Sequence, residues 1–375
     1  MEKVLSGLRI INVSTSLPSG AGRAFMIYSR ALRELGAEVE AWTFAPDQAM
    51  LAELAAEGFT TRVLGLLKHS YRLSSSKALA AALADSAPDW VHAHSYETVL
   101  HASRAKAMGA FKHLMICQHD ARLRWPRRLY AWSHRTAPEM VIAHTPTHAN
   151  TLATWYGYPP ERVVALPLPV SDACFEAHVR QKALADELGV AGAYPVVTWV
   201  GRLQREKGHA DLLWAFRTVV ARFPAARLLL VGSGKHGDYL ENLARRLGLR
   251  EHVVFTGVRG DVPQILALTD VFACPSHAET LCMAVQEAMA AGKPVVSTDV
   301  SGPHDYIADG ENGLIVPIGR PKPMAEAILR LAGEADLARR LGQAARAYAQ
   351  EHFSTTQFVT GLGSIYVRAI GGRTP

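Results

Sequence analysis

Short apolar runs, many of them β-branched, alternate with amphipathic stretches along most of this chain. The runs predict strands at 8–14, 39–44, 61–66, 90–95, 113–119, 140–145 and 163–168, and then at 195–201, 226–232, 253–257, 271–275, 294–298 and 313–317. Helical spacing is clearest at 22–36, 77–87, 147–157, 208–222, 238–248, 281–291 and 322–350. Repeated strand–helix alternation is typical of parallel sheets with helices on both faces. We therefore expect an α/β protein with doubly wound sheets.

The alternation starts again after the proline-rich stretch 166–169, and 375 residues are too many for one ordinary core. We predict two Rossmann-like domains, at 1–171 and 172–353, and a closing helix within 354–375 that packs back towards the first domain. Ligands of such sheets bind beyond the carboxyl ends of the strands. The site is accordingly expected in a cleft between the two domains.

Composition agrees with a cytoplasmic globular protein. Apolar residues make up 49% and charged residues 20%. No apolar run reaches the roughly 20 residues that span a bilayer, and the first residues lack the pattern of a signal peptide. The four cysteines show no CxxC spacing and are interpreted as buried free thiols in a reducing compartment: Cys117, Cys174, Cys274 and Cys282.

The net charge of +6 lies mostly in the first half of the chain. Residues 1–171 hold 18 Lys and Arg against 13 Asp and Glu, and residues 104–135 hold eight basic side chains against Asp120 alone. Such a surplus favours an anionic partner, which could be phosphate, membrane or nucleic acid.

The segment 275–296 carries the strongest indication of chemistry. Glu279 stands where a predicted loop meets a predicted helix that begins near Leu281, and Glu287 lies two turns further on, about 12 Å along a continuous helix. The amides at this helix start would face a diphosphate, which the helix dipole favours. These amides belong to Thr280, Leu281, Cys282 and Met283. The alternative for Glu287, which sits among apolar residues, is a structural salt bridge.

Arg202 and Lys207 follow directly on the first predicted strand of the second domain. Two fixed cations at this position could neutralise a diphosphate leaving group. The chain contains no Asp-x-Asp pair, so we predict no metal site and no metal cofactor. Ordinary surface charge is the alternative interpretation of these two residues.

Two glycine-containing loops follow predicted strands. The loop 17–22 contains Gly20, and small residues there let the backbone approach a ligand closely. The stretch that starts at Gly232 matches GxGxxG, but no strand ending in an acidic residue follows about 20 residues later. We interpret it as a tight turn near a nucleotide, and not as the fingerprint of a dehydrogenase.

His119 ends a predicted strand of the first domain, at its carboxyl end. A histidine there could donate a hydrogen bond to a sugar hydroxyl or a phosphate. A purely structural histidine is the alternative.

Together these segments resemble the retaining glycosyltransferases of GT-B fold, family four, over nearly the whole chain. Glu279 and Glu287 match that family's Glu-x7-Glu pattern, and 287–317 reads like its usual continuation. The resemblance implies that Glu279 contacts the donor sugar and Glu287 the ribose hydroxyls. Further roles follow from the same resemblance: Arg202 and Lys207 bind the diphosphate, Gly20 lies in the N-terminal glycine loop, His119 is the cleft histidine, and Val258 and Arg259 hold the base through backbone atoms.

The resemblance implies metal-independent transfer of a hexose-type sugar from a UDP- or GDP-sugar, with retention, to a hydroxyl acceptor. Glycolipid, lipopolysaccharide and polysaccharide synthesis are the pathways considered. The chain departs from the family where Thr280, Leu281 and Cys282 replace glycines, and where 167–171 replaces an Asn-Gly-Val-Asp turn. These departures leave the sugar and the acceptor surface open.

Three alternatives remain at this stage. One keeps the fold but makes the protein an epimerase or a phosphorylase, and another makes it a basic nucleic-acid-binding protein, for which we find no recognition motif. The third concerns location. The segment 122–135 interleaves five arginines with Trp125, Tyr130 and Trp132, which suits either peripheral contact with anionic lipid at the inner face of the cell membrane and a lipid-linked acceptor, or a solvated basic face.

Overall fold

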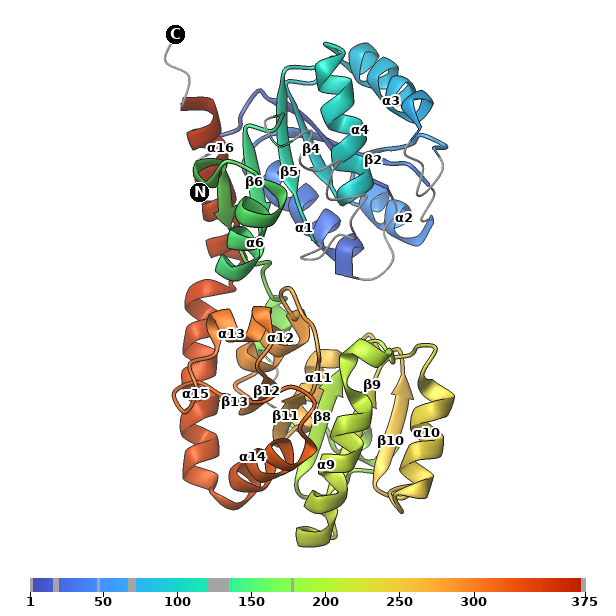
Figure 1. The fold of residues 1–375 in the computed structure, drawn as a ribbon, viewed down its shortest axis with the longest axis vertical. Coiled ribbons are helices and arrows are strands. Elements are labelled where there is room, and N and C mark those ends of the chain that lie inside the picture. The colour runs from blue at the N-terminus through green and yellow to red at the C-terminus, as the bar shows by residue number, and fades with distance from the viewer. Residues whose placement is uncertain are drawn as a thin grey trace. The chain divides into compact units, whose positions relative to one another are not determined.

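The computed structural model describes residues 3–15, 20–45, 48–66, 72–119, 135, 137–176 and 179–371, which form two compact units (Figure 1). The first unit combines Met1–Pro169 with Thr356–Pro375, and the second is Val170–Thr355. Each is built on a parallel sheet, of seven strands in the first and six in the second. The predicted pair of α/β units is therefore confirmed.

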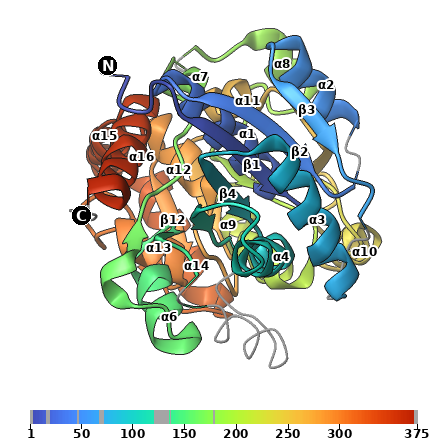
Figure 2. The same cartoon turned by 90° about the horizontal axis from the view of Figure 1, so that it is seen from above.

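The first sheet has the strand order β3-β2-β1-β4-β5-β6-β7, and β3, β2, β1 and β4 can be followed side by side in Figure 2. Its strands are β1 (Arg9–Ser14), β2 (Glu38–Thr43), β3 (Thr60–Val63), β4 (Trp90–His94), β5 (His113–Cys117), β6 (Met140–Ala143) and β7 (Val163–Ala165). Its helices are α1 (Gly20–Glu34), α2 (Gln48–Ala56), α3 (Leu73–Ser86), α4 (Tyr96–Ala107), α6 (Pro146–Tyr156) and α16 (Thr355–Gly371), with a 3-10 turn η1 (Pro160–Arg162). All seven strands predicted for this half are present.

The two faces of this sheet differ in polarity, because successive side chains of a strand point to opposite faces. On β4, Val91 and Ala93 join an apolar core with α3, α4 and α6. His92 and His94 point the other way, where they pack against Tyr28 of α1, and His92 also lies against Tyr366 of α16. One face is therefore an ordinary hydrophobic core, whereas the other buries histidines and tyrosines.

The second sheet has the order β10-β9-β8-β11-β12-β13. Its strands are β8 (Val196–Val200), β9 (Arg227–Val231), β10 (Val253–Gly257), β11 (Val271–Cys274), β12 (Val295–Thr298) and β13 (Leu314–Val316). Its helices are α7 (Asp172–Glu176), α8 (Lys182–Glu187), η2 (Arg205–Lys207), α9 (His209–Arg222), α10 (Gly237–Arg246), α11 (Val262–Leu268), α12 (Met283–Ala290), α13 (Ser301–Tyr306), α14 (Pro321–Gly333) and α15 (Ala335–His352).

Two helix predictions for this half were wrong in detail. The helix expected at 322–350 is two helices, because the chain breaks its helical path between Gly333 and Ala335. The helix expected to begin near Leu281 begins at Met283. Glu279 therefore precedes the helix, and the rise of a continuous helix does not give its distance from Glu287.

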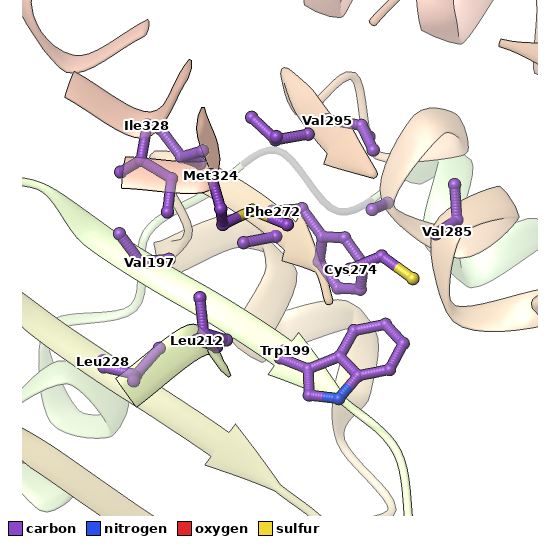
Figure 3. Close-up of a cluster of buried hydrophobic side chains, with 14 of the residues drawn as sticks. Val197, Trp199, Leu212, Leu228, Phe272, Cys274, Val285, Val295, Met324 and Ile328 are labelled. Carbon is purple, nitrogen blue, oxygen red and sulfur yellow. The ribbon is translucent and has the colours of Figure 1, made fainter. Parts of the chain in front are cut away.

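Alternation along the strands also divides the core of the second unit. Val197 and Trp199 of β8 face the large cluster in Figure 3, which includes Phe272 and Met324, while Val196 faces a smaller cluster with α8 and α11. All four cysteines are buried and free, as predicted. In the described part of the chain, no helix is long and apolar enough to cross a bilayer.

Close backbone packing fixes the loops at the carboxyl edge of the second sheet. Gly208 has φ +65°, and a Cβ there would lie 1.8 Å from the carbonyl oxygen of Pro275. Gly232 has φ +135°, and its Cβ would lie 2.2 Å from the carbonyl oxygen of Gly201. Only glycine fits either position, because both the dihedral angle and the space exclude a side chain.

We expect Gly208→Ala to destabilise the second unit far more than Gly248→Ala. Gly248 also has a left-handed φ, of +71°, but a Cβ at this position would meet no atom within 4 Å, so alanine there has only the backbone cost of about 1 kcal/mol. Alanine at 208 adds the collision with Pro275. Urea unfolding of both variants measures the difference, and equal losses of stability would contradict the packing argument.

Candidate functional site

An ion pair joins the loops that follow β8 and β11. Lys207 Nζ lies 2.7 Å from Glu279 Oε1, and the buried Ser276 hydroxyl donates to the same oxygen at 2.7 Å. Ser276 is held in turn, since its carbonyl accepts a hydrogen bond from the Thr298 hydroxyl at 2.5 Å. The structure thus brings together Lys207 and Glu279, which the sequence placed in one site.

The backbone just before α12 offers unused donors. Among the described residues, none of four successive amides donates a hydrogen bond: those of Thr280, Leu281, Cys282 and Met283. Cys282 has the left-handed backbone φ 60°, ψ 70° and is the N-cap of α12. Free amides at a helix start form an anion-binding surface.

Helix α13 holds this unusual turn in place. The Tyr306 hydroxyl donates to the carbonyl of Leu281 at 2.6 Å, and a Cβ on Gly302 would lie 2.7 Å from the same oxygen. Tyr306 of α13 thus engages the carbonyls of both Leu281 and Cys282, the second at 3.3 Å. Ser276, Gly302 and Tyr306 were missed at the sequence level, although the serine lies in the segment that was singled out.

Electrostatics favour a charged Lys207. Burial lowers the pKa of its ammonium, but the Glu279 carboxylate more than offsets this, so that the pKa is raised above its ordinary value. For the Cys282 thiol, burial has the opposite effect and raises the pKa well above its usual range, so this cysteine stays uncharged. The site is therefore a fixed cation–carboxylate pair beside neutral backbone donors.

Glu287 and Arg202 lie at the two extremes of exposure. The Glu287 side chain is 6% exposed on α12, whereas Arg202 is exposed where the chain leaves β8. Arg202 lies on the same loop as Lys207, which begins where β8 ends. The ribose role of Glu287 and the diphosphate role of Arg202 stay predictions.

The other predicted donor residues lie on the loops after β9 and β10. Gly232 donates its amide to the carbonyl of Gly257 at 2.8 Å, so close packing of these loops already explains that glycine. Val258 is 78% exposed. The Arg259 side chain is bound to Asp261 at 2.6 Å and to Glu187 at 2.7 Å. Any contact of Arg259 with a base would thus be left to its backbone, as the resemblance implies.

A pocket of about 480 Å³ opens beside the same loops and was not predicted. It is lined by the starts of α9 and α10 and by His277, which pairs with Asp211 at 2.6 Å. The buried His209 also lines it, and burial lowers the pKa of this histidine to about 4.

In the first unit, His119 is one of a row of histidines. Its Nε2 lies 3.1 Å from His94 Nδ1, and its Nδ1 lies 2.8 Å from His144 Nε2. His144 Nδ1 lies 3.4 Å from the carbonyl oxygen of Leu166. Because that carbonyl only accepts, His144 carries its proton on Nδ1, and the bonds run in one direction from His94 through His119 to Leu166.

This arrangement engages both ring nitrogens of His119. Donation to a sugar or a phosphate, as predicted, would require one of these hydrogen bonds to break. Gly20 begins α1, while Asp120 and the residues of the basic segment 122–135 other than Arg135 lie outside the described residues. The predicted membrane contact of that segment stays a prediction.

Burial keeps the whole row uncharged. It lowers the pKa of His92 to about 3 and that of His144 to about 4, and it holds the pKa values of His94 and His119 well below the ordinary value. Burial also raises the pKa of the neighbouring Cys117 thiol to about 12, although its hydrogen bond to Tyr28 opposes the shift.

Comparison with known proteins gives matches along most of the chain. Residues 181–348 match the family described as glycosyl transferases group 1, and residues 18–173 match glycosyltransferase family 4. D-inositol 3-phosphate glycosyltransferase of Nocardia farcinica is 31% identical over 71% of this chain, and the lipopolysaccharide core biosynthesis glycosyltransferase LpsE of Rhizobium meliloti is 40% identical over 40% of it. The chain spans 60% and 43% of the lengths of these two relatives.

Solved structures show the same fold. HepE of Anabaena in complex with UDP has a TM-score of 0.84 at 22% identity, covering 96% of this chain and 99% of that one. Sucrose-phosphate synthase of Thermosynechococcus elongatus has a TM-score of 0.80 at 19% identity and covers 98% of this chain and all of that one. The predicted GT-B fold is confirmed by these neighbours.

We expect acid to destabilise the first unit through its neutral histidines. Between pH 6.5 and about 4, the unfolded chain binds a proton at residue 144 that the folded unit does not. The contribution of each such neutral histidine to the free energy of unfolding is therefore fully present above pH 6.5. It falls with decreasing pH, by about 1.4 kcal/mol per pH unit. His144→Gln should flatten this slope in thermal unfolding between pH 7 and 5. Equal slopes in the parent and His144→Gln would refute the assignment.

Proposed function

This chain is a member of the group 1 glycosyltransferases of family four, and we propose that it transfers a hexose-type sugar from a nucleoside-diphosphate sugar to a hydroxyl acceptor with retention of configuration. The observation that carries the proposal is the Lys207–Glu279 pair beside the four free amides at the start of α12. A donor diphosphate needs a cation and hydrogen-bond donors, and its sugar needs a fixed acceptor. This loop pair supplies all three.

The proposed donor position follows from the chemistry of each group. The diphosphate lies on the amides of 280–283, where the dipole of α12 favours negative charge. Lys207 and Arg202 neutralise the charge that develops on the leaving phosphate. Glu279, held by Ser276 and Lys207, accepts hydrogen bonds from sugar hydroxyls, and Glu287 accepts those of the ribose.

Retention requires that the acceptor hydroxyl attack from the face that the diphosphate leaves. Because the departing phosphate is then close to that hydroxyl, it can take the acceptor's proton, and no separate general base is needed. Sugar–oxygen bond cleavage puts the electron pair on the phosphate, and the acceptor oxygen forms the new bond. His119 is proposed to contribute through hydrogen bonding in the cleft, without taking the proton.

The acceptor is proposed to be a hydroxyl compound, with an anionic one favoured by the basic surplus of the first half of the chain. Among the pathways, lipopolysaccharide synthesis is suggested by a relative named for lipopolysaccharide core biosynthesis, and another relative is named for D-inositol 3-phosphate, an anionic hydroxyl compound. Peripheral membrane contact belongs to the same proposal. In this proposal, residues 122–135 make the contact with the membrane.

Two variants that replace a carboxylate by a carboxamide test the two proposed roles of Glu287 and Glu279 separately. Glu287→Gln should weaken binding of UDP or GDP by at least about tenfold, because hydrogen bonds to a charged acceptor are worth roughly 1.5–3 kcal/mol each. Glu279→Gln should leave that binding near the parental value and lower kcat for the sugar donor. Calorimetry with the free nucleoside diphosphate and initial rates with the nucleotide-sugar give the two readouts. Equal nucleotide affinity of Glu287→Gln and parent, or unchanged kcat in Glu279→Gln, would reject the corresponding role.

Turnover should need no added Mg²⁺ or Mn²⁺, because Arg202 and Lys207 hold the diphosphate in place of a cation. Rates are compared before and after treatment with EDTA, and then with each of the two ions added back. The rate after an ion is added back decides the question. Activity that is lost to EDTA and restored by Mg²⁺ or Mn²⁺ would overturn the proposal. Lys207→Ala, which removes one of these charges, should lower kcat, and it should also lower the melting temperature because the Glu279 carboxylate, 7% exposed, loses its ion-pair partner.

A further inference from the structure

The starts of two helices of the second unit meet at the pocket of about 480 Å³. Helix α9 follows β8 and helix α10 follows β9, and these two strands are neighbours in the sheet. The loop before α10 packs on the loop before α9, because the His236 amide donates to the Leu203 carbonyl at 3.0 Å. A Cβ on Gly234 would lie 2.4 Å from the same carbonyl oxygen. Close packing of the two loops thus brings both helix starts to one pocket.

Free backbone donors are present at both helix starts. Among the described residues, four amides there donate no hydrogen bond: those of His209 and Ala210 in α9, and those of Asp238 and Tyr239 in α10. The two helices have 14 and 10 residues, so each carries a dipole whose positive end lies at the pocket. Such amides bind anions, and the dipole favours negative charge beside them.

A buried imidazole in the wall of the pocket has no partner. His209 is 2% exposed and lines the pocket, and among the described residues neither of its ring nitrogens forms a hydrogen bond. Burial lowers the pKa of this ring, and the Gln204 carbonyl only partly opposes the shift. The neutral ring carries one N–H that can donate to an oxyanion. Since a buried polar group without a partner costs free energy, we expect this ring to find its partner in the pocket.

The charged side chains of the lining also favour an anion. Arg205 is exposed and forms no ion pair with any described residue. Asp211 is the only carboxylate among the described residues of the lining, and it already lies 2.6 Å from His277 Nε2. An anion in the pocket would therefore meet a guanidinium without a partner, whereas a cation would compete with His277 for its carboxylate.

We infer that this pocket binds the phosphate group of a small hydroxyl compound, such as a sugar phosphate, through Arg205, the His209 ring and the amides at the starts of α9 and α10. Guanidinium groups and helix-start amides are the donors that proteins use for phosphate. The volume lies in the range of roughly 300–1,000 Å³ that is usual for small-molecule pockets, so an organic part has room beside the phosphate. Tyr239, which is 55% exposed, offers this part an aromatic surface.

This pocket is distinct from the proposed donor position on 280–283. The connections through α9 and α10 run along the sheet in one direction, from β8 to β10, and the connection through α12 runs in the other, from β11 to β12. Because such crossovers are right-handed, α9 and α10 cover one face of the sheet and α12 covers the other. The inference concerns the second unit alone and does not rest on the proposed transferase activity.

Calorimetric titration of the full chain with glucose 6-phosphate tests the inference, with glucose and inorganic phosphate as comparisons. Glucose 6-phosphate should bind more tightly than inorganic phosphate, and glucose should not bind. Saturating UDP or GDP should leave this binding unchanged, because the amides of 280–283 belong to the other face of the sheet. A chain that binds glucose 6-phosphate but no nucleotide would contradict the proposed function and leave this inference standing.

Variants of the lining place the binding in this pocket. Arg205→Gln should weaken the binding of glucose 6-phosphate by about tenfold or more, because a charge-assisted hydrogen bond is lost. Arg217→Gln is the matched control, since Arg217 is also exposed and lies on α9 but does not line the pocket. It should bind as the parent does. His209→Gln should also weaken binding, and the exposed Arg205 keeps the test available if that buried variant does not fold.

Four results would overturn the inference. They are absence of binding by glucose 6-phosphate at millimolar concentrations, affinity no higher than that of inorganic phosphate, displacement by UDP or GDP, and equal affinity of Arg205→Gln and Arg217→Gln.

Discussion

The contact between Gly208 and Pro275 sets the geometry of the loops that follow β8 and β11 in the second unit. The chain at 208 approaches the Pro275 carbonyl so closely that a Cβ would overlap it. Lys207 directly precedes this contact and Glu279 follows four residues after it, so the position of one loop determines that of the other. The ion pair between them at 2.7 Å is thus a product of backbone packing. Under the proposed function, a cation fixed in this way is preorganised, because it needs no rearrangement when charge develops on the leaving group.

Sequence pattern predicted the sheets well and the helix boundaries less well. The strands of both units were found because buried parallel strands are continuous apolar runs, such as Val196–Val200. Helix α4 was missed because it is buried nearly all round, with Glu97 and His101 among its buried residues, and so lacks an amphipathic stripe. The late start of α12 was missed for another reason. The turn at Cys282 is imposed by Tyr306 and Gly302, and no local signal reveals a constraint that comes from another helix.

The same limit explains how much of the candidate site could be predicted from the sequence. Lys207 and Glu279 could be named from the sequence because each follows a strand whose end was recognisable. His119 could be named as well, but its surroundings could not, because they depend on how three strands align. Once the register places His94 beside Cys117, the two-residue period puts the histidines on one face. That register is a property of the folded sheet, and it converts isolated histidines into a connected row.

The last helix of the second half of the sequence belongs to the first unit. The Tyr366 hydroxyl of α16 lies 3.0 Å from His92 Nδ1, on the sheet face against which Tyr28 of α1 also packs, and Phe358 packs on Tyr28. During synthesis on the ribosome, the part of this face that Tyr366 and Phe358 cover stays open until the chain beyond the second unit has emerged. At about 5–20 residues per second, the intervening Val170–Thr355 takes on the order of ten to forty seconds to make. The second unit can complete its own core in that interval, so the half of the protein that is made first is the half that finishes folding last.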